Sequence, residues 1–244
     1  MKVILCGYNW VGCKALDILL EHNHEVFVYT HNSPSYVPSL KNYCLEKGIS
    51  YSLKKINLES IPFKPDIVCS IYYRYIIPED VIKYVNNKIF NLHPSLLPEY
   101  KGCSSLTWAM INGEKRVGFT YHYIESGVDT GDIILQKKID IEEFDTQQTL
   151  YYRVMFESMR FFYKAFKHVI NNKNVIKQSS NIGKYYKRGC PFFGEINDNW
   201  DDAKIKRFIR AMIFPPLPYA KYKGKEIRTY DDYLKIKKGN EDII

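Results

Sequence analysis

The sequence has no apolar run long enough to cross a membrane as a helix, a span that takes roughly 20 consecutive apolar residues. It also has no recognisable signal peptide, because the short apolar stretch of MKVILCGYNW leads into GYNWVG rather than into a small-residue cleavage site. Of its 244 residues, 45% are hydrophobic and 25% are charged, which is typical of a globular protein. We therefore expect a soluble, cytoplasmic protein without a membrane partner.

Paired cysteines are absent as well. The six cysteines form no C-x-x-C pair and have no nearby histidine at the spacing of zinc ligands. They are Cys6, Cys13, Cys44, Cys69, Cys103 and Cys190. Neither a disulfide framework nor a structural metal site is indicated, so we expect reduced thiols, most of them buried, and no bound metal.

The chain lacks a recognised RNA-binding motif, although it carries a formal net charge of +8 and 21 tyrosines. A positive charge could serve a nucleic acid, a membrane surface or a phosphate-bearing small substrate. Here the basic residues are spread along the chain and the tyrosines follow no stripe, so we expect no nucleic-acid partner. A non-catalytic module that binds nucleotides or RNA stays open as an alternative of another class.

What the sequence does contain is an alternation of short apolar runs with helical patterns. The runs, rich in β-branched residues as in strands buried on both faces of a parallel sheet, are 2–7, 25–30, 66–71 and 88–93. The helical patterns between them cover 12–21, 40–46 and 78–84. Strand and helix in alternation predict right-handed crossovers and a Rossmann-like α/β fold.

The pattern changes after residue 115. Two alternating segments flank the turn-rich ESGVDTGD, which predicts two antiparallel strands and therefore a mixed, mostly parallel sheet with flanking helices. A long amphipathic helix is expected over 146–170, then a short helix over 201–213 and a β-hairpin after a proline-rich turn. We expect one main domain over 1–175 and a small C-terminal appendage over 176–244.

The segment CGYNWVGCKAL follows a strand and opens a helix, the place where open α/β sheets bind phosphates or dinucleotides. The match to either fingerprint is poor, because Asn9 replaces the middle glycine of the dinucleotide loop and Cys13 interrupts the phosphate loop. We interpret Gly7 and Gly12 as allowing a tight turn and close helix packing. Substrate binding by Asn9 and Trp10 is the functional alternative, and a nicotinamide-dependent oxidoreductase is a further one.

Two polar residues stand at the end of the fourth predicted strand. In FNLHPSLLPEYKG (90–102), Asn91 and His93 are two positions apart, so their side chains point to the same side of a strand. Pro94 excludes helix at His93, and the loop that follows is long enough to cover a pocket before SSLTWAMING begins a helix. Histidine is often a core residue and asparagine beside a turn is often a cap, so these positions alone leave both interpretations open.

A second polar segment, ESGVDTGDII, supplies Asp129 and Asp132, and Gly127 and Gly131 would free its backbone for unusual dihedral angles. FNLHPSLLPEYKG and the later WAMINGEKRVGFTYHYIESGVDTGDIILQ together resemble the formyltransferases that use 10-formyltetrahydrofolate. The resemblance joins Asn-x-His-Pro-Ser-Leu-Leu-Pro to Asp-x-Gly-Asp-Ile at the family's separation, and it extends loosely from residue 1 to about 230. One departure is Ser105, which stands where many members have proline.

The resemblance implies that Asn91, His93 and Asp129 are catalytic, that 10-formyltetrahydrofolate is the co-substrate, and that no metal takes part. It also implies a folate pocket between YYRYIIP and the loop that begins at Tyr123. The expected cofactor-binding residues are Tyr73, Arg74, Tyr75, Ile76, Tyr123, Ile124, Val128 and Asp132. Candidate substrate-binding residues are Asn9, Trp10, Ser95, Gly102 and Arg188.

Formyl transfer suits these residue types. An amine attacks the formyl carbon, negative charge develops on the formyl oxygen, and a proton passes from the amine to the leaving nitrogen. Asn91 can donate an amide hydrogen bond to that oxygen, a role worth roughly 3 to 4 kcal/mol. His93, oriented by Asp129, can stabilise the oxygen when protonated or carry the proton, and both roles stay open.

The tail after the long helix bears on which amine is formylated. It is too short for the roughly 100-residue barrel domain of the methionyl-tRNA enzymes, and the enzymes for glycinamide ribonucleotide usually end near the long helix. The stretch YYKRGCPFFGEINDNWDDAKIKRFIRAMIFPPLPYAKYKGKEI resembles the tail of sugar N-formyltransferases. That likeness implies a homodimer acting on a dTDP- or UDP-linked amino sugar for a bacterial O-antigen, a lipopolysaccharide component, or a related glycan. The first choice is dTDP-4-amino-4,6-dideoxyglucose, with methionyl-tRNA and glycinamide ribonucleotide as alternatives.

Overall fold

The computed structural model describes residues 1–179 and 182–239. The chain packs as two compact units, each assembled from three stretches of sequence. Unit 1 comprises Met1–His93, Phe119–Lys137 and Met155–Ile182, and unit 2 comprises Pro94–Gly118, Lys138–Val154 and the chain from Gly183 onward. The predicted domain boundary after residue 175 stays a prediction.

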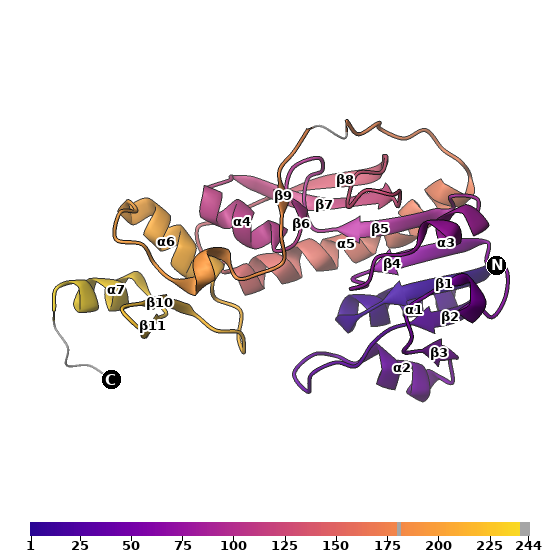
Figure 1. Cartoon of the computed structure of the whole chain (residues 1–244), viewed down its shortest axis with the longest axis horizontal. Helices are drawn as coiled ribbons and strands as arrows, with labels where there is room; N and C mark the ends of the chain where they lie inside the picture. The colour runs from indigo at the N-terminus through magenta and orange to yellow at the C-terminus, as the bar shows by residue number, and fades with distance from the viewer. Residues whose placement is uncertain (180–181, 240–244) are drawn as a thin grey trace. The chain divides into compact units, whose positions relative to one another are not determined.

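Seven strands form one sheet in the order β3-β2-β1-β4-β5-β7-β8 (Figure 1). They are β1 (Lys2–Gly7), β2 (Glu25–Tyr29), β3 (Tyr51–Ser52), β4 (Ile67–Ile71), β5 (Ile89–His93), β7 (Arg116–Tyr123) and β8 (Ile133–Asp140). The strands from β3 to β5 run parallel, and β7 lies antiparallel to β5. The prediction of a Rossmann-like, mostly parallel sheet is confirmed, although the two-residue β3 was not foreseen.

The helices follow the sequence pattern closely, with two differences. They are α1 (Asn9–Glu21), α2 (Leu40–Lys47), α3 (Glu79–Tyr84), α4 (Ser105–Asn112), α5 (Gln147–Ile170), α6 (Asp202–Ala211) and α7 (Tyr230–Lys237). Helix α1 begins at Asn9, three residues before the predicted start, and α7 was not predicted. A capping box marks the start of α7, because Thr229 Oγ1 accepts from the Asp232 backbone N–H and the Asp232 carboxylate accepts from the Thr229 N–H.

The turn between β1 and α1 explains its glycines. A Cβ at Gly7 would lie 2.9 Å from Leu40 Cδ2 and 3.4 Å from Gly12 Cα, so the two glycines allow the helix to approach the strand closely. Asn9 has a φ of 62°, in the left-handed region that asparagine tolerates better than most residues. The glycines therefore serve close packing, as interpreted from the sequence.

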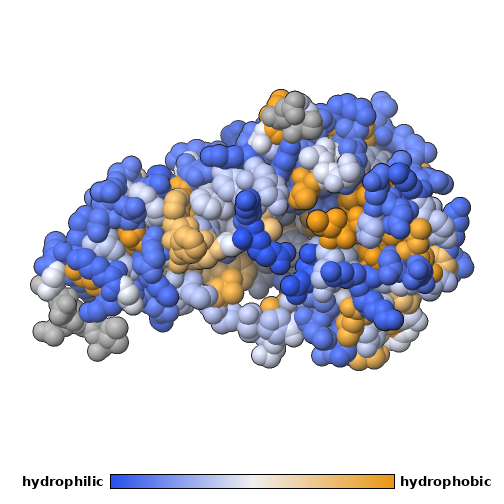
Figure 2. Space-filling model, viewed as in Figure 1, coloured by the Kyte–Doolittle hydropathy of each residue, from blue (hydrophilic) through white to orange (hydrophobic). Residues whose placement is uncertain are grey.

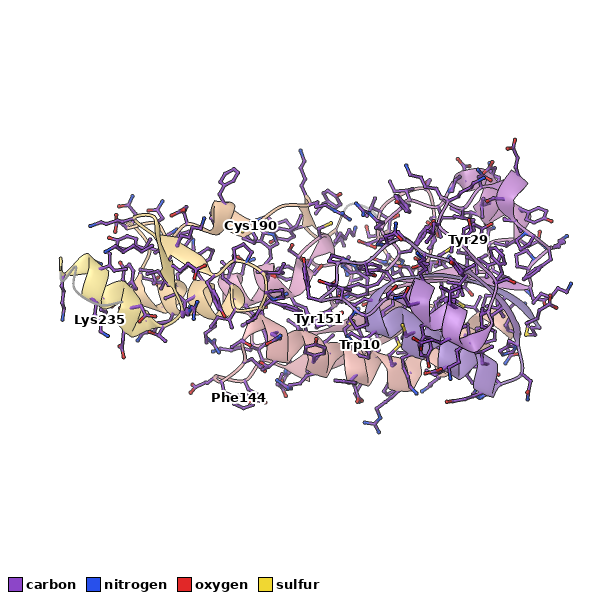
Figure 3. The ribbon with its side chains drawn as sticks, turned by 90° about the horizontal axis from the view of Figure 1, so that it is seen from below. Trp10, Tyr29, Phe144, Tyr151, Cys190 and Lys235 are labelled. Carbon is purple, nitrogen blue, oxygen red and sulfur yellow. The ribbon has the colours of Figure 1, made fainter. Side chains whose placement is uncertain are left out.

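The core of unit 1 lies against the central strands. Every residue of β4 is buried, as is every residue of β1 after Lys2, which accounts for their continuous apolar sequences. One cluster of buried residues comprises Ile4, Cys6, Tyr29, Ile56, Val68, Ile77, Val81, Ile82, Val85 and Ile89. Each fully buried aliphatic side chain stabilises the fold by about 1.5–3 kcal/mol. Tyr29, labelled in Figure 3, satisfies its hydroxyl by donating to Ser60 Oγ at 3.0 Å.

Unit 2 combines helices with two small two-stranded sheets. Helix α4 packs against α6, and β6 (Lys101–Gly102) pairs in parallel with β9 (Tyr185–Tyr186). The predicted C-terminal hairpin is formed by β10 (Ala220–Tyr222) and β11 (Lys225–Ile227). Short 3₁₀ turns lie at Leu58–Ser60 in unit 1 and Pro191–Gly194 in unit 2. No helix within residues 1–179 and 182–239 is long and apolar enough to span a membrane.

Candidate active site

The carboxyl end of β5 presents the two polar residues that the sequence singled out. His93 is 4% exposed, and its Nδ1 lies 3.4 Å from Oδ2 of Asp129. Asn91, two residues earlier, is partly buried. Asp129 comes from the loop between β7 and β8, and its side chain is only 10% exposed. In this setting, with little water to screen it, the carboxylate orients the imidazole of His93.

A second histidine, not predicted from the sequence, joins these three residues. His122 on β7 is 2% exposed. Its Nε2 lies 3.4 Å from Oδ1 of Asp129 and 3.2 Å from Nδ2 of Asn91. Its Nδ1 lies 2.8 Å from the carbonyl oxygen of Tyr123. His122 therefore lies between Asn91 and the Asp129 carboxylate, and the predicted trio converges in unit 1.

The pairing of β5 with β7 explains why these side chains meet. Asn91 is paired with His122 and His93 with Thr120, so each strand contributes two polar residues to one face. Thr120 Oγ1 in turn accepts a hydrogen bond of 2.9 Å from Gln136 Nε2 on β8. The signal for His122 in the sequence was its spacing of two from Thr120, the same spacing that separates Asn91 from His93.

The backbone of the β7–β8 loop contains one left-handed residue near its glycines. Asp129 has a φ of 55°, in the left-handed region, whereas Gly127 and Gly131 lie outside that region. The positive φ therefore belongs to Asp129 and not to the two glycines. Gly131 supplies space instead, because a Cβ there would lie 2.0 Å from the Tyr123 carbonyl oxygen. Strain of this kind costs about 1–3 kcal/mol and clusters at functional sites.

Gly131→Ala should therefore act on the position of Asp129. The added methyl cannot fit beside the Tyr123 carbonyl without moving the loop, so we expect kcat of the reaction proposed below to fall about 10-fold to 100-fold. Overpacking should also cost about 1–3 kcal/mol of stability. Gly48→Ala is the control, because Gly48 has a φ of 66° but no atom within 4 Å of the added Cβ. Equal kcat values in the two variants would contradict this reading.

A cavity of about 330 Å³ adjoins the same loop in unit 1. It is lined by Glu79, Ile82, Lys83, Asn87, Tyr123, Ile124, Glu125, Ser126 and Asp132. Its volume falls at the lower end of the range for ligand pockets. Burial raises the pKa of the Tyr123 phenol, with the neighbouring Asp132 carboxylate as a second cause. Figure 2 shows hydrophobic residues gathered over the region where Figure 1 draws β4, β5 and α3.

The segment after β4 was predicted to bind the cofactor, and its side chains are placed unequally. Tyr73 accepts a 3.1 Å hydrogen bond from the Ile56 N–H and packs against the core, and burial raises the pKa of its phenol. Arg74 lies over the ring of Tyr75, 5.5 Å from its centroid. Ile76 is 82% exposed. The side chains of residues 73–76 are thus placed differently, and their role in binding the cofactor stays a prediction.

Of the remaining predicted cofactor residues, Tyr123, Ile124 and Asp132 line the cavity, whereas Val128 is exposed on the loop. The Asp132 carboxylate forms an ion pair of 2.6 Å with Lys177, which raises the pKa of that lysine. The ion pair of Asp132 therefore also connects Lys177 to the loop.

Among the described residues, no group of three or more His, Cys, Asp or Glu side chains is arranged to hold a metal ion.

The predicted substrate residues divide between the units. In unit 1, Asn9 Oδ1 accepts from the Trp10 backbone N–H at 2.6 Å. Trp10, labelled in Figure 3, contacts Phe156 of α5 with ring centroids 4.6 Å apart. These contacts are structural, and the binding role of both residues stays a prediction.

Unit 2 holds the other three. The Ser95 hydroxyl donates to the Glu99 carbonyl oxygen at 2.7 Å. Gly102 has a φ of 88°, and a Cβ there would lie 2.3 Å from the Tyr186 carbonyl oxygen, so β6 requires glycine for its pairing with β9. Arg188 is exposed two residues beyond β9. Ser95 and Gly102 thus have structural reasons for their identity, and binding by all three stays a prediction.

Comparison with known proteins agrees with this geometry. Residues 31–166 match the family model described as formyl transferase. The chain is also 34% identical, over 250 aligned residues, to the GDP-perosamine N-formyltransferase of Brucella melitensis biotype 1, an alignment that covers 98% of this chain and 96% of the relative. The chain belongs to the formyl transferase family.

Two solved structures place it more closely within that family. WlaRD, a sugar 3N-formyl transferase solved with dTDP and 5-N-formyl-THF, has a TM-score of 0.81, 27% identity, and coverage of 93% of this chain and 85% of its own. The N-formyltransferase from Helicobacter canadensis, in complex with folinic acid and dTDP-3-aminofucose, has a TM-score of 0.78, 27% identity, and coverage of 93% and 86%. The fold and the family resemblance inferred from the sequence are therefore confirmed.

Proposed function

We propose that this chain transfers the formyl group of 10-formyltetrahydrofolate to the amino group of a nucleotide-linked amino sugar. The observation that carries the proposal is the convergence of Asn91, His93 and Asp129, with His122, at the carboxyl end of β5 in a chain of the formyl transferase family. Each group matches one demand of the reaction, and none is needed for a passive nucleotide-binding module.

The roles follow from the chemistry of the groups. Asn91 donates an amide hydrogen to the formyl oxygen as the attacking amine drives negative charge onto it. His93 lies beside a carboxylate, so it either stabilises the same oxygen as an imidazolium or carries the amine proton to the leaving nitrogen. Asp129 orients the ring through Nδ1.

The folate co-substrate is assigned to the cavity beside the β7–β8 loop. Backbone N–H and C=O groups of a loop suit the alternating donors and acceptors of a pterin edge, and residues 124–126 line this cavity. The structural neighbours bind 5-N-formyl-THF and folinic acid, which supports a folate here. We propose Tyr123, Ile124 and Asp132 as its lining residues and the backbone of 73–76 as the facing edge.

The acceptor is proposed at the level of its class. The sequence favours dTDP-4-amino-4,6-dideoxyglucose, and two neighbours were solved with dTDP or a dTDP-linked amino sugar. The relative from Brucella is named for a GDP-linked sugar, so the assay must determine which nucleotide base the acceptor carries. We further propose that the enzyme is a cytoplasmic homodimer and that its product enters an O-antigen or related glycan.

The test is a formylation assay with a panel of acceptors. The protein is incubated with 10-formyltetrahydrofolate and dTDP-, UDP- and GDP-linked amino sugars, including dTDP-4-amino-4,6-dideoxyglucose and GDP-perosamine, with glycinamide ribonucleotide and methionyl-tRNA as competing arms. Mass spectrometry should find one added formyl group on a nucleotide sugar. Formylation of either competing arm alone would overturn the acceptor class, and formylation of nothing would overturn the proposed function.

A further inference from the structure

Three polar side chains lie next to each other across three strands of unit 1. Ser70 of β4 is paired with Asn91 of β5, and Asn91 is paired with His122 of β7. We call Ser70, Asn91 and His122 the amide ladder. Ser70 is 5% exposed and His122 is 2% exposed, so both flanking groups are shielded from water.

The hydrogen bonds of the amide ladder run in one direction when the His122 ring is neutral. The Tyr123 carbonyl oxygen can only accept, so His122 Nδ1, 2.8 Å away, carries a hydrogen. In a neutral ring this is the only ring hydrogen, so His122 Nε2 accepts from the Asn91 amide nitrogen, 3.2 Å away. On the other side, the Ser70 hydroxyl donates to Asn91 Oδ1 at 2.9 Å.

This arrangement selects one of the two orientations of the Asn91 amide. A rotation by half a turn would place Oδ1 against the lone pair of His122 Nε2, which is repulsive and leaves buried polar atoms mismatched. The Tyr123 carbonyl therefore fixes the His122 tautomer, and that tautomer fixes the amide. Of the two hydrogens on Asn91 Nδ2, His122 takes one and the other is available to the formyl oxygen.

We propose that Ser70 and His122 are positioning residues that hold the NH₂ group of Asn91 toward the reacting oxygen. The inference rests on the proposed function, because it assigns Asn91 the oxyanion. Neither residue is expected to touch the substrate. Asp129 Oδ1, 3.4 Å from the same His122 nitrogen, competes with Asn91 for it, so the amide ladder needs His122 to remain neutral.

The test compares variants that remove a ladder hydrogen bond with variants that keep it. Ser70→Ala removes the donor to Oδ1 and His122→Leu removes the acceptor for Nδ2, whereas Ser70→Thr and His122→Gln each keep a suitable group. We expect kcat for formyl transfer to fall about 10-fold to 100-fold in the first pair, with KM values for both substrates within about twofold of wild type. The second pair should recover most of the lost kcat.

A double-mutant cycle separates positioning from general damage. If Ser70 and His122 act through Asn91, adding Ser70→Ala or His122→Leu to Asn91→Ala should lower kcat no further. Ser158→Ala is the matched control, because Ser158 is a fully buried serine whose hydroxyl donates to the Met155 carbonyl oxygen at 2.7 Å. It should lose comparable stability without loss of kcat.

Two outcomes would overturn the inference while the proposed function stands. One is a wild-type enzyme that formylates a nucleotide sugar while Ser70→Ala and His122→Leu keep normal kcat. The other is an equal fold-loss in the presence and absence of the Asn91 side chain, which would mark the two residues as merely structural. A wild-type protein that formylates nothing would overturn the proposed function, and the inference with it.

Discussion

Asn91→Ala should lower kcat for formyl transfer about 100-fold to 1,000-fold, the loss found when a single oxyanion donor is removed from an enzyme. The amide hydrogen is aimed at charge that exists only in the transition state, so its removal should affect kcat and leave KM for both substrates nearly unchanged. The partly buried site at the end of β5 strengthens the effect, because little water can replace the lost donor.

The same substitution has a predictable cost in stability. It leaves the Ser70 hydroxyl without its acceptor and His122 Nε2 without its donor, and buried groups left unpaired cost about 1–3 kcal/mol. A thermal transition that remains cooperative but shifts to lower temperature is expected. Asn171→Ala, at an exposed asparagine, is the control for a change of composition alone. A variant of Asn91 with wild-type kcat would show that the amide does not stabilise the oxygen.

The fold could be predicted because its signals are local. Continuous apolar runs gave β1, β4 and β5, and the change to alternation after residue 115 gave the antiparallel β7 and β8. Short elements escaped this reasoning. The two-residue β3 has too few residues for any period to appear, and its pairing with β2 comes from tertiary contact.

Part of the candidate site could be predicted for the same reason. Asn91 and His93 share a strand face by their spacing alone, and Asp129 was reached by resemblance to a family. His122 and Ser70 were missed because they become neighbours of Asn91 only through strand pairings between distant parts of the chain. The register of these strand pairings cannot be predicted from any single segment of the sequence.

The backbone of Asp129 shows a different limit of sequence reasoning. Glycine is the usual residue at positive φ, and the loop has two glycines that would free its backbone. Instead Asp129 takes the left-handed conformation, and Gly131 makes room for the Tyr123 carbonyl. The strained backbone conformation therefore falls on Asp129, the residue that faces His93. At this position a functional demand outweighs the conformational preference of the residue.

Asp129→Asn separates the charge of this residue from its backbone. Asparagine keeps the shape of the side chain and tolerates positive φ about as well as aspartate, so the fold should be little affected. The carboxylate that orients His93 is lost. We expect kcat to fall about 100-fold to 10,000-fold, the range over which positioned acid–base groups act.

Asp129→Ala provides the comparison that makes this prediction sharp. Alanine removes the carboxylate as asparagine does, but it also meets the steric cost of about 1–2 kcal/mol that an ordinary residue bears in the left-handed region. The two variants should therefore share the loss of kcat and differ in melting temperature, with alanine the lower. If asparagine instead retains wild-type kcat, the negative charge is dispensable, and His93 must be oriented by its position on β5 alone.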